Sequence, residues 1–142
     1  MVYRLHFFAT TGEDSGQAAI NRLLDELVAS GRAVLGEWRG PFVDEVAAYQ
    51  LATPSSDGSA AADWLTLELH VGVDFNADTV IEIDPDAEHA IWGSDLHAEV
   101  SLSGANPDWE LVDRIWSTLE RLWSAIAWDE QSKFKISRHV PS

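Results

Sequence analysis

Hydrophobic and polar residues alternate along three stretches of the chain, residues 2–9, 64–75 and 96–102. Alternation with a period of two places successive side chains on opposite faces of a strand, so each stretch is expected to bury one face. Glu68 and His70 occupy polar positions of the longest stretch. Further strands are expected on either side of Gly40-Pro41, over residues 79–84 and in the basic tail 132–140.

Two other stretches have the three- and four-residue spacing of amphipathic helices. The first helix is expected over about residues 16–30, where Ile20, Leu23 and Leu27 share a face and Gly31 follows as a stop. The second is expected over about residues 107–127, with Asn106 as its N-cap and Pro107 as its first helical residue.

The sequence therefore predicts an α+β fold with a mostly antiparallel sheet of about six or seven strands. The one-sided alternation of the strands requires both helices to cover the same face of the sheet and leaves the other face to water. At 142 residues, without a repeat or a linker, the chain is expected to form a single domain over residues 1–142.

Three tryptophans, Trp109, Trp116 and Trp123, follow one another at seven-residue intervals in the second helix. At about 100° per residue they lie along one edge of an apolar arc roughly 160° wide, which suits a helix lying on a sheet. Core filling is the preferred interpretation. The alternative is a row of partly exposed rings that anchors a partner or a second copy of the chain.

Charge is distributed very unevenly along the chain. The formal net charge is −15, and the segment from Gly40 to Asp113 contains sixteen carboxylates and no Lys or Arg. Such a segment repels nucleic acid and anionic lipid, because binding to phosphate requires Lys and Arg. We expect no nucleic-acid partner. No secretory signal or membrane span is expected either, which predicts a cytoplasmic, soluble protein, and the absence of cysteine fits a reducing compartment.

The preferred functional hypothesis is an acidic binding protein that docks a basic protein partner through a carboxylate-rich sheet face. In general style the chain is similar to bacterial immunity proteins and to DNA mimics, which are also small, acidic and cysteine-free, but no motif places it in either family. The expected docking residues are Trp64, Glu68, Asp74, Glu82, Asp84, Asp86, Glu88, Trp92 and Glu99.

A second hypothesis is a metal-binding protein or an acid/base enzyme. Glu68-x-His70 and His97-x-Glu99 each place a carboxylate and an imidazole on the polar face, about 6.5 Å apart along a strand. If the two strands were neighbours with these residues opposite, Glu68, His70, His97 and Glu99 could bind a divalent cation such as Zn²⁺ or supply a general acid and base.

No catalytic or nucleotide-binding motif is present, so no catalytic residue and no organic cofactor is predicted, and an enzyme is the less favoured class. A homo-oligomer, such as a homodimer that uses the tryptophan row as its contact, remains a third hypothesis.

Overall fold

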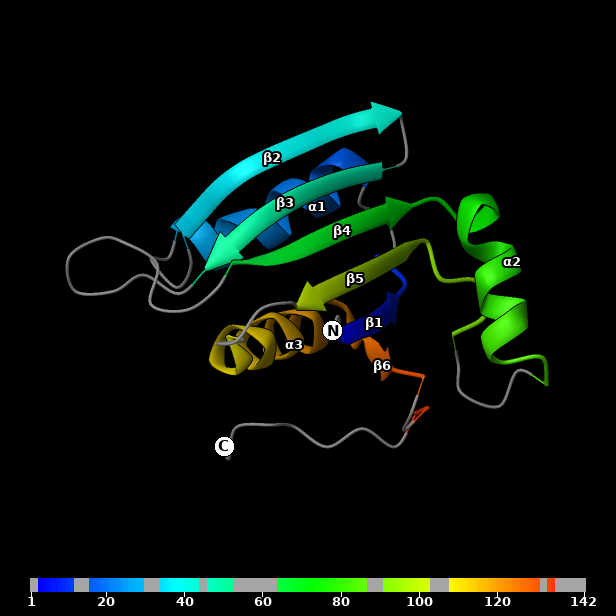
Figure 1. Ribbon diagram of the computed structural model, residues 1–142. Helices are drawn as coiled ribbons and strands as arrows, with labels where there is room; N and C mark the ends of the chain where they lie inside the picture. The colour runs from blue at the N-terminus through cyan, green and yellow to red at the C-terminus, as the bar shows by residue number, and fades with distance from the viewer. Residues whose placement is uncertain are drawn as a thin grey trace.

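The computed structural model describes residues 3–11, 16–29, 34–43, 46–52, 64–86, 91–102, 108–130 and 133–134. Six strands form one antiparallel sheet in the order β2-β3-β4-β5-β1-β6 (Figure 1). They are β1 (Tyr3–Ala9), β2 (Val34–Val43), β3 (Val46–Ala52), β4 (Leu65–Val71), β5 (Leu96–Leu102) and β6 (Ile126–Trp128). The predicted α+β class and antiparallel sheet are confirmed.

Two helices cover one face of this sheet, as the alternation requires (Figure 1). Helix α1 (Gly16–Leu24) continues as a π-helical segment, η1 (Asp25–Ala29), and α3 (Trp109–Trp123) lies beside it. Their apolar stripes meet the inward side chains of the strands in one main core. The fully buried members of that core include Leu5, Leu23, Leu51, Leu65, Leu67, Leu69, Val100, Leu111, Val112, Ile115 and Leu119.

A third helix, α2 (Val73–Ile83), replaces the strand predicted over residues 79–84 and the end of the strand predicted over 64–75. The strand ends before Gly72, whose φ of 112° lies outside the range of other residues. After it, Val80 is buried and Ala77 and Ile83 are half-buried, a three-residue spacing that is helical. The alternation continues past Gly72 in the sequence, so the strand predicted over residues 64–75 extends too far.

Two predicted boundaries are also wrong. Strand β2 continues through Gly40-Pro41, where register shifts against β3 accommodate the glycine and the proline. Helix α3 ends at Trp123 rather than near residue 127, because Ser124 adopts a left-handed conformation with φ 54°, after which the Ala125 N–H donates to the Leu119 carbonyl. Residues 126–128 then form β6.

The start of α3 also differs from the prediction. Asp108 is the N-cap, and its Oδ1 accepts a hydrogen bond from the Leu111 N–H at 3.1 Å. The predicted cap and first residue, Asn106 and Pro107, lie outside the described residues, as does most of the tail strand predicted over 132–140.

The second face of the sheet, called the outer face here, is only partly open to water. Helix α2 lies beyond the ends of β4 and β5 (Figure 1) and contributes Val80 to a second small core with Phe8 and Ile91. This core covers one end of the outer face. The expectation that the whole outer face is solvated is therefore wrong at that end.

The tryptophans of α3 pack against the main core. Trp116 is buried and meets Phe7 edge to face at 5.8 Å, and Trp109 and Trp123 are partly buried against the same core. Their positions agree with core filling. Among the described residues, no helix is long and apolar enough to cross a membrane.

Candidate functional site

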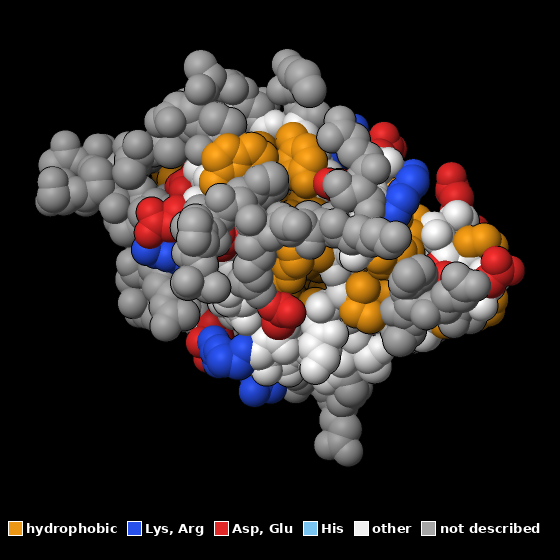
Figure 2. Space-filling view, turned by 90° about the horizontal axis from the view of Figure 1, so that it is seen from below, with side chains coloured by type: hydrophobic (Ala, Val, Ile, Leu, Met, Phe, Trp, Pro, Cys, Tyr) orange, Lys and Arg blue, Asp and Glu red, His pale blue; other side chains and the backbone are white. Residues whose placement is uncertain are grey.

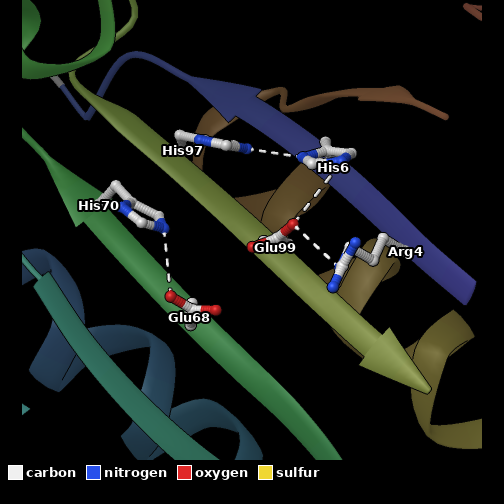
Figure 3. Close-up of polar contacts among 6 residues, drawn as sticks. All are labelled: Arg4, His6, Glu68, His70, His97 and Glu99. Atoms are coloured by element: carbon white, nitrogen blue, oxygen red, sulfur yellow. Dashed lines mark hydrogen bonds and ion pairs between the residues drawn. The ribbon is translucent and has the colours of Figure 1, made fainter. Parts of the chain in front are cut away.

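Two rows of polar side chains cross the outer face of the sheet where β4, β5 and β1 lie side by side. In the first row Glu68, Glu99 and His6 are register partners on the three strands, and in the second row His70 is directly opposite His97. Neighbouring strands lie about 4.8 Å apart, so side chains of one row can touch. We call these five residues together with Arg4 the His-Glu cluster (Figure 3).

Three donors in the His-Glu cluster converge closely enough to bind one ion. A ring nitrogen of His70 and one carboxylate oxygen from each of Glu68 and Glu99 all lie within 4.8 Å of one another. His70 Nε2 lies 3.6 Å from Glu68 Oε1. These side chains are partly exposed, so the convergence point is accessible from water.

His6 approaches the carboxylate of Glu99 from the side opposite Glu68. Its Nε2 lies 3.8 Å from Glu99 Oε1, and its Nδ1 lies 2.9 Å from His97 Nε2 in a hydrogen bond (Figure 3). The guanidinium of Arg4 also reaches Glu99 Oε1, with its Nε at 3.8 Å. Trp128 of β6 holds the His6 ring edge to face at 5.3 Å.

His97 is the buried member of the cluster. Its ring lies flat against Phe8, with ring centroids 4.7 Å apart and an interplanar angle of 8°, and it stacks on His6 and His70 as well. Burial, reinforced by the neighbouring His6 and His70, lowers the pKa of His97 to about 3. The ring is therefore neutral at pH 7 and has one nitrogen that accepts and one that donates.

Burial also lowers the pKa of His6 from its usual value. The carboxylate of Glu130 opposes this shift, and the positive charge of Arg4 adds to it. A neutral imidazole is the form that binds a metal ion, because only that form has a lone pair to offer.

The sequence-based metal set is therefore brought together only in part. The facing arrangement of Glu68 with Glu99 and of His70 with His97 is as the hypothesis required. His97 is a neighbour of the convergence point rather than a member of it, because Phe8 and His6 cover its ring.

Sequence reasoning did not single out His6. The alternation of residues 2–9 places it on the polar face, but its position beside Glu99 depends on the pairing of β1 with β5, which lie about ninety residues apart in the chain. A search for every outward histidine on every predicted strand could have included it.

The expected docking residues are spread over different parts of the molecule. Asp84, which follows α2, is buried, with 3% of its surface exposed, and its backbone carbonyl accepts a hydrogen bond from the indole of Trp92. The expectation that its side chain faces a partner is therefore wrong. Trp64 and Trp92 are exposed, Asp74 lies in the first turn of α2, and Glu88 lies outside the described residues.

Glu82 lies in the last turn of α2, Asp86 follows the helix, and both are exposed. Glu82 lines a cleft of about 530 Å³ together with Trp128, Glu130 and Lys133. On the face shown in Figure 2 the described Asp and Glu side chains lie at separate places, with Lys and Arg near several of them. On this face the acidic side chains form no single patch, and docking of a basic partner stays a prediction.

No protein-family model matches the chain, and comparison with curated proteins and with solved structures gives no match either. The function is therefore inferred from the chemistry of the His-Glu cluster.

Proposed function

We propose that this protein binds a divalent metal cation on the outer face of its sheet, through Glu68, His70 and Glu99. The observation that supports this most directly is the convergence of one donor atom from each residue within 4.8 Å. Imidazole and carboxylate together form a donor set common to zinc and related transition metals.

The spacing of the donors suits a metal ion. Two ligands that each lie about 2.1 Å from a tetrahedral zinc ion are roughly 3.4 Å from each other. The 3.6 Å between His70 Nε2 and Glu68 Oε1 is close to that value. Small side-chain rotations would bring the third donor, on Glu99, to the same separation.

Electrostatics supports a cation at the same place. Glu68 and Glu99 are register partners on one face, and like charges directly opposite each other on neighbouring strands are destabilising. Arg4 offsets only part of this repulsion, because its side chain is 63% exposed and its charge is screened by water. A divalent cation between the carboxylates would turn the repulsion into attraction.

The competing interpretation is a polar sheet face held by weak ion pairs alone. His70 lies near Glu68 and His6 near Glu99 in any case, and half-exposed sheets commonly present such residues. Metal binding distinguishes the two interpretations, because ion pairs alone create no high-affinity site for a cation.

The test is calorimetric titration of the untagged, chelator-treated full chain with Zn²⁺. We expect one ion per chain and loss of that binding in Glu68→Gln, His70→Ala and Glu99→Gln. Glu110→Gln removes a carboxylate from α3, on the opposite side of the sheet, and Gln50→Ala alters β3 opposite Thr66, so both controls should bind as the native chain does. Equal zinc binding by the three site variants and the native chain would refute the proposal.

A further inference from the structure

We infer that His6 is the fourth protein ligand of the proposed cation, that His97 orients it, and that the cation is a tetrahedral transition metal of the zinc type rather than Ca²⁺ or Mg²⁺. This inference rests on the proposed metal-binding function. It adds a ligand from β1, a strand that contributes nothing to the Glu68, His70 and Glu99 set.

The position of the His6 Nε2 atom is the first observation that supports a fourth ligand. It lies 3.8 Å from Glu99 Oε1, close to the spacing of two ligands on one zinc ion. Glu99 is on the middle strand of the three, and about 10 Å separate β1 from β4. His6 is not among the donors that lie within 4.8 Å of one another, so the side chains of Glu68 and His70 must rotate toward Glu99 for all four residues to bind one metal ion.

The second step is the hydrogen bond on the other ring nitrogen. His6 Nδ1 lies 2.9 Å from His97 Nε2, so Nδ1 is engaged and Nε2 faces Glu99. A metal on Nε2 requires the His6 proton on Nδ1, and that N–H then donates to His97 Nε2. Metal-binding histidines usually have such an acceptor on the second nitrogen, which fixes the tautomer and the ring orientation.

The third step is the rigidity of this acceptor. His97 is buried and lies flat on Phe8, and Phe8 belongs to the small core with Val80 and Ile91. Trp128 holds the His6 ring from the side away from His97. The two imidazoles are therefore fixed by packing, which reduces the conformational entropy that metal binding would cost.

The donor set also selects the metal. Two imidazoles and two carboxylates give four donors, which suits tetrahedral Zn²⁺ or Co²⁺. Ca²⁺ prefers six to eight oxygen ligands, and Mg²⁺ prefers an octahedron of oxygens. We therefore expect a strong preference for Zn²⁺ over both.

The experiment is a titration of the chelator-treated full chain with Co²⁺, which reports coordination through its visible absorption, followed by displacement with Zn²⁺. His6→Phe keeps an aromatic ring against Trp128 and removes the ligand. Loss of an orienting partner typically weakens metal binding by roughly 10- to 100-fold. We expect His6→Phe to weaken Co²⁺ binding by more than this and to abolish the tetrahedral absorption. His6→Asn is the second variant, and circular dichroism establishes that each variant is folded.

His97 is tested by a matched pair of variants. His97→Phe keeps the stacking on Phe8 but removes the acceptor, and we expect binding about 10- to 100-fold weaker. His97→Gln places an amide oxygen near the former Nε2, and we expect it to restore affinity and the native Co²⁺ spectrum. A purely structural role would instead make the two variants alike.

The outcomes separate this inference from the function on which it rests. If Glu68→Gln and His70→Ala lose the metal but His6→Phe retains it with an unchanged spectrum, His6 is not a ligand and the inference is wrong while the proposed function stands. If His97→Phe binds as the native chain does, the positioning role is wrong. Binding of Ca²⁺ or Mg²⁺ as tight as that of Zn²⁺ would overturn the assignment of the metal.

Discussion

Glu68 and Glu99 are register partners, so two carboxylates face each other across β4 and β5 on the outer face of the sheet. Such a pair opposes folding unless something positive lies between the two groups. This relationship connects the proposed function to stability, because the same two residues should destabilise the metal-free protein and bind the metal.

The first prediction concerns the metal-free protein. Glu68→Gln should raise the free energy of unfolding in the presence of a chelator by about 0.2–1 kcal/mol, because it removes one of two facing like charges. Urea denaturation measures the change. Glu110→Gln is the control. It removes a carboxylate whose exposed ion pair with Arg114 is stabilising, so this variant should have unchanged or slightly lower stability. A loss of stability in Glu68→Gln would show that the facing carboxylates do not repel each other significantly.

The second prediction concerns the arginine beside the cluster. Arg4→Gln should tighten metal binding by about two- to fivefold, because the guanidinium competes with the metal for Glu99 Oε1 and repels the cation. Calorimetric titration at low ionic strength measures the change, and added salt should reduce the difference. Weaker binding in this variant would indicate that Arg4 supports the site.

The third prediction concerns acid stability. The pKa of His97 is lowered to about 3 in the folded protein, while an unfolded chain has the ordinary value of about 6.5. Between these values the unfolded state binds the extra proton, so stability is complete above pH 6.5 and falls as the pH decreases. His97 alone contributes at most about 1.4 kcal/mol for each pH unit in this window.

Urea denaturation of the metal-free protein between pH 7 and pH 5 measures this effect, above the range in which most carboxylates titrate. His6 and His70 face the same ring, and burial lowers the pKa of His6 as well, so part of the slope belongs to His6. His97→Phe should show a smaller slope than the native chain. An identical slope in both would mean that His97 is protonated in the folded state.

The fourth prediction concerns the start of α3. Asp108→Ala should cost about 1 kcal/mol of stability, because the Leu111 N–H loses its acceptor. Asp108→Asn keeps an oxygen at the cap and should restore most of the loss. Thermal or urea unfolding measures both variants, and equal stability of the alanine and asparagine variants would exclude a capping role.

The fifth prediction concerns the tryptophan row. Trp116→Ala should cost about 3–5 kcal/mol, because the indole is buried against Phe7 in the main core. Trp64→Ala, at a residue 40% exposed, is the control and should change stability by less than about 0.5 kcal/mol. Comparable small effects at the two positions would argue that Trp116 is not a core residue.

The sequence allowed the faces of the strands to be predicted, but not their neighbours. Alternation placed Glu68 and His70 outward on one strand and His97 and Glu99 outward on another, because the side-chain direction of a strand is a local property. Because a further strand was predicted over residues 79–84, the sequence did not show whether the strands predicted over residues 64–75 and 96–102 are neighbours in the sheet. Helix α2 occupies that segment instead, so β4 pairs directly with β5.

The remainder of the site depends on non-local packing. His6 meets Glu99 only because β1 inserts beside β5, and His97 is buried only because Phe8 and α2 form a small core against it. No pattern within either strand encodes these contacts. The glycine at position 72 was the local indication that the strand ends early, and its φ of 112° explains why.

The central claim is tested most directly by crystals of the full chain grown with Zn²⁺ and measured on both sides of the zinc absorption edge. We predict one anomalous peak per chain, about 2.1 Å from His70 and from carboxylate oxygens of Glu68 and Glu99. Peaks elsewhere, for example at His89 or His139, without one at this position would contradict it.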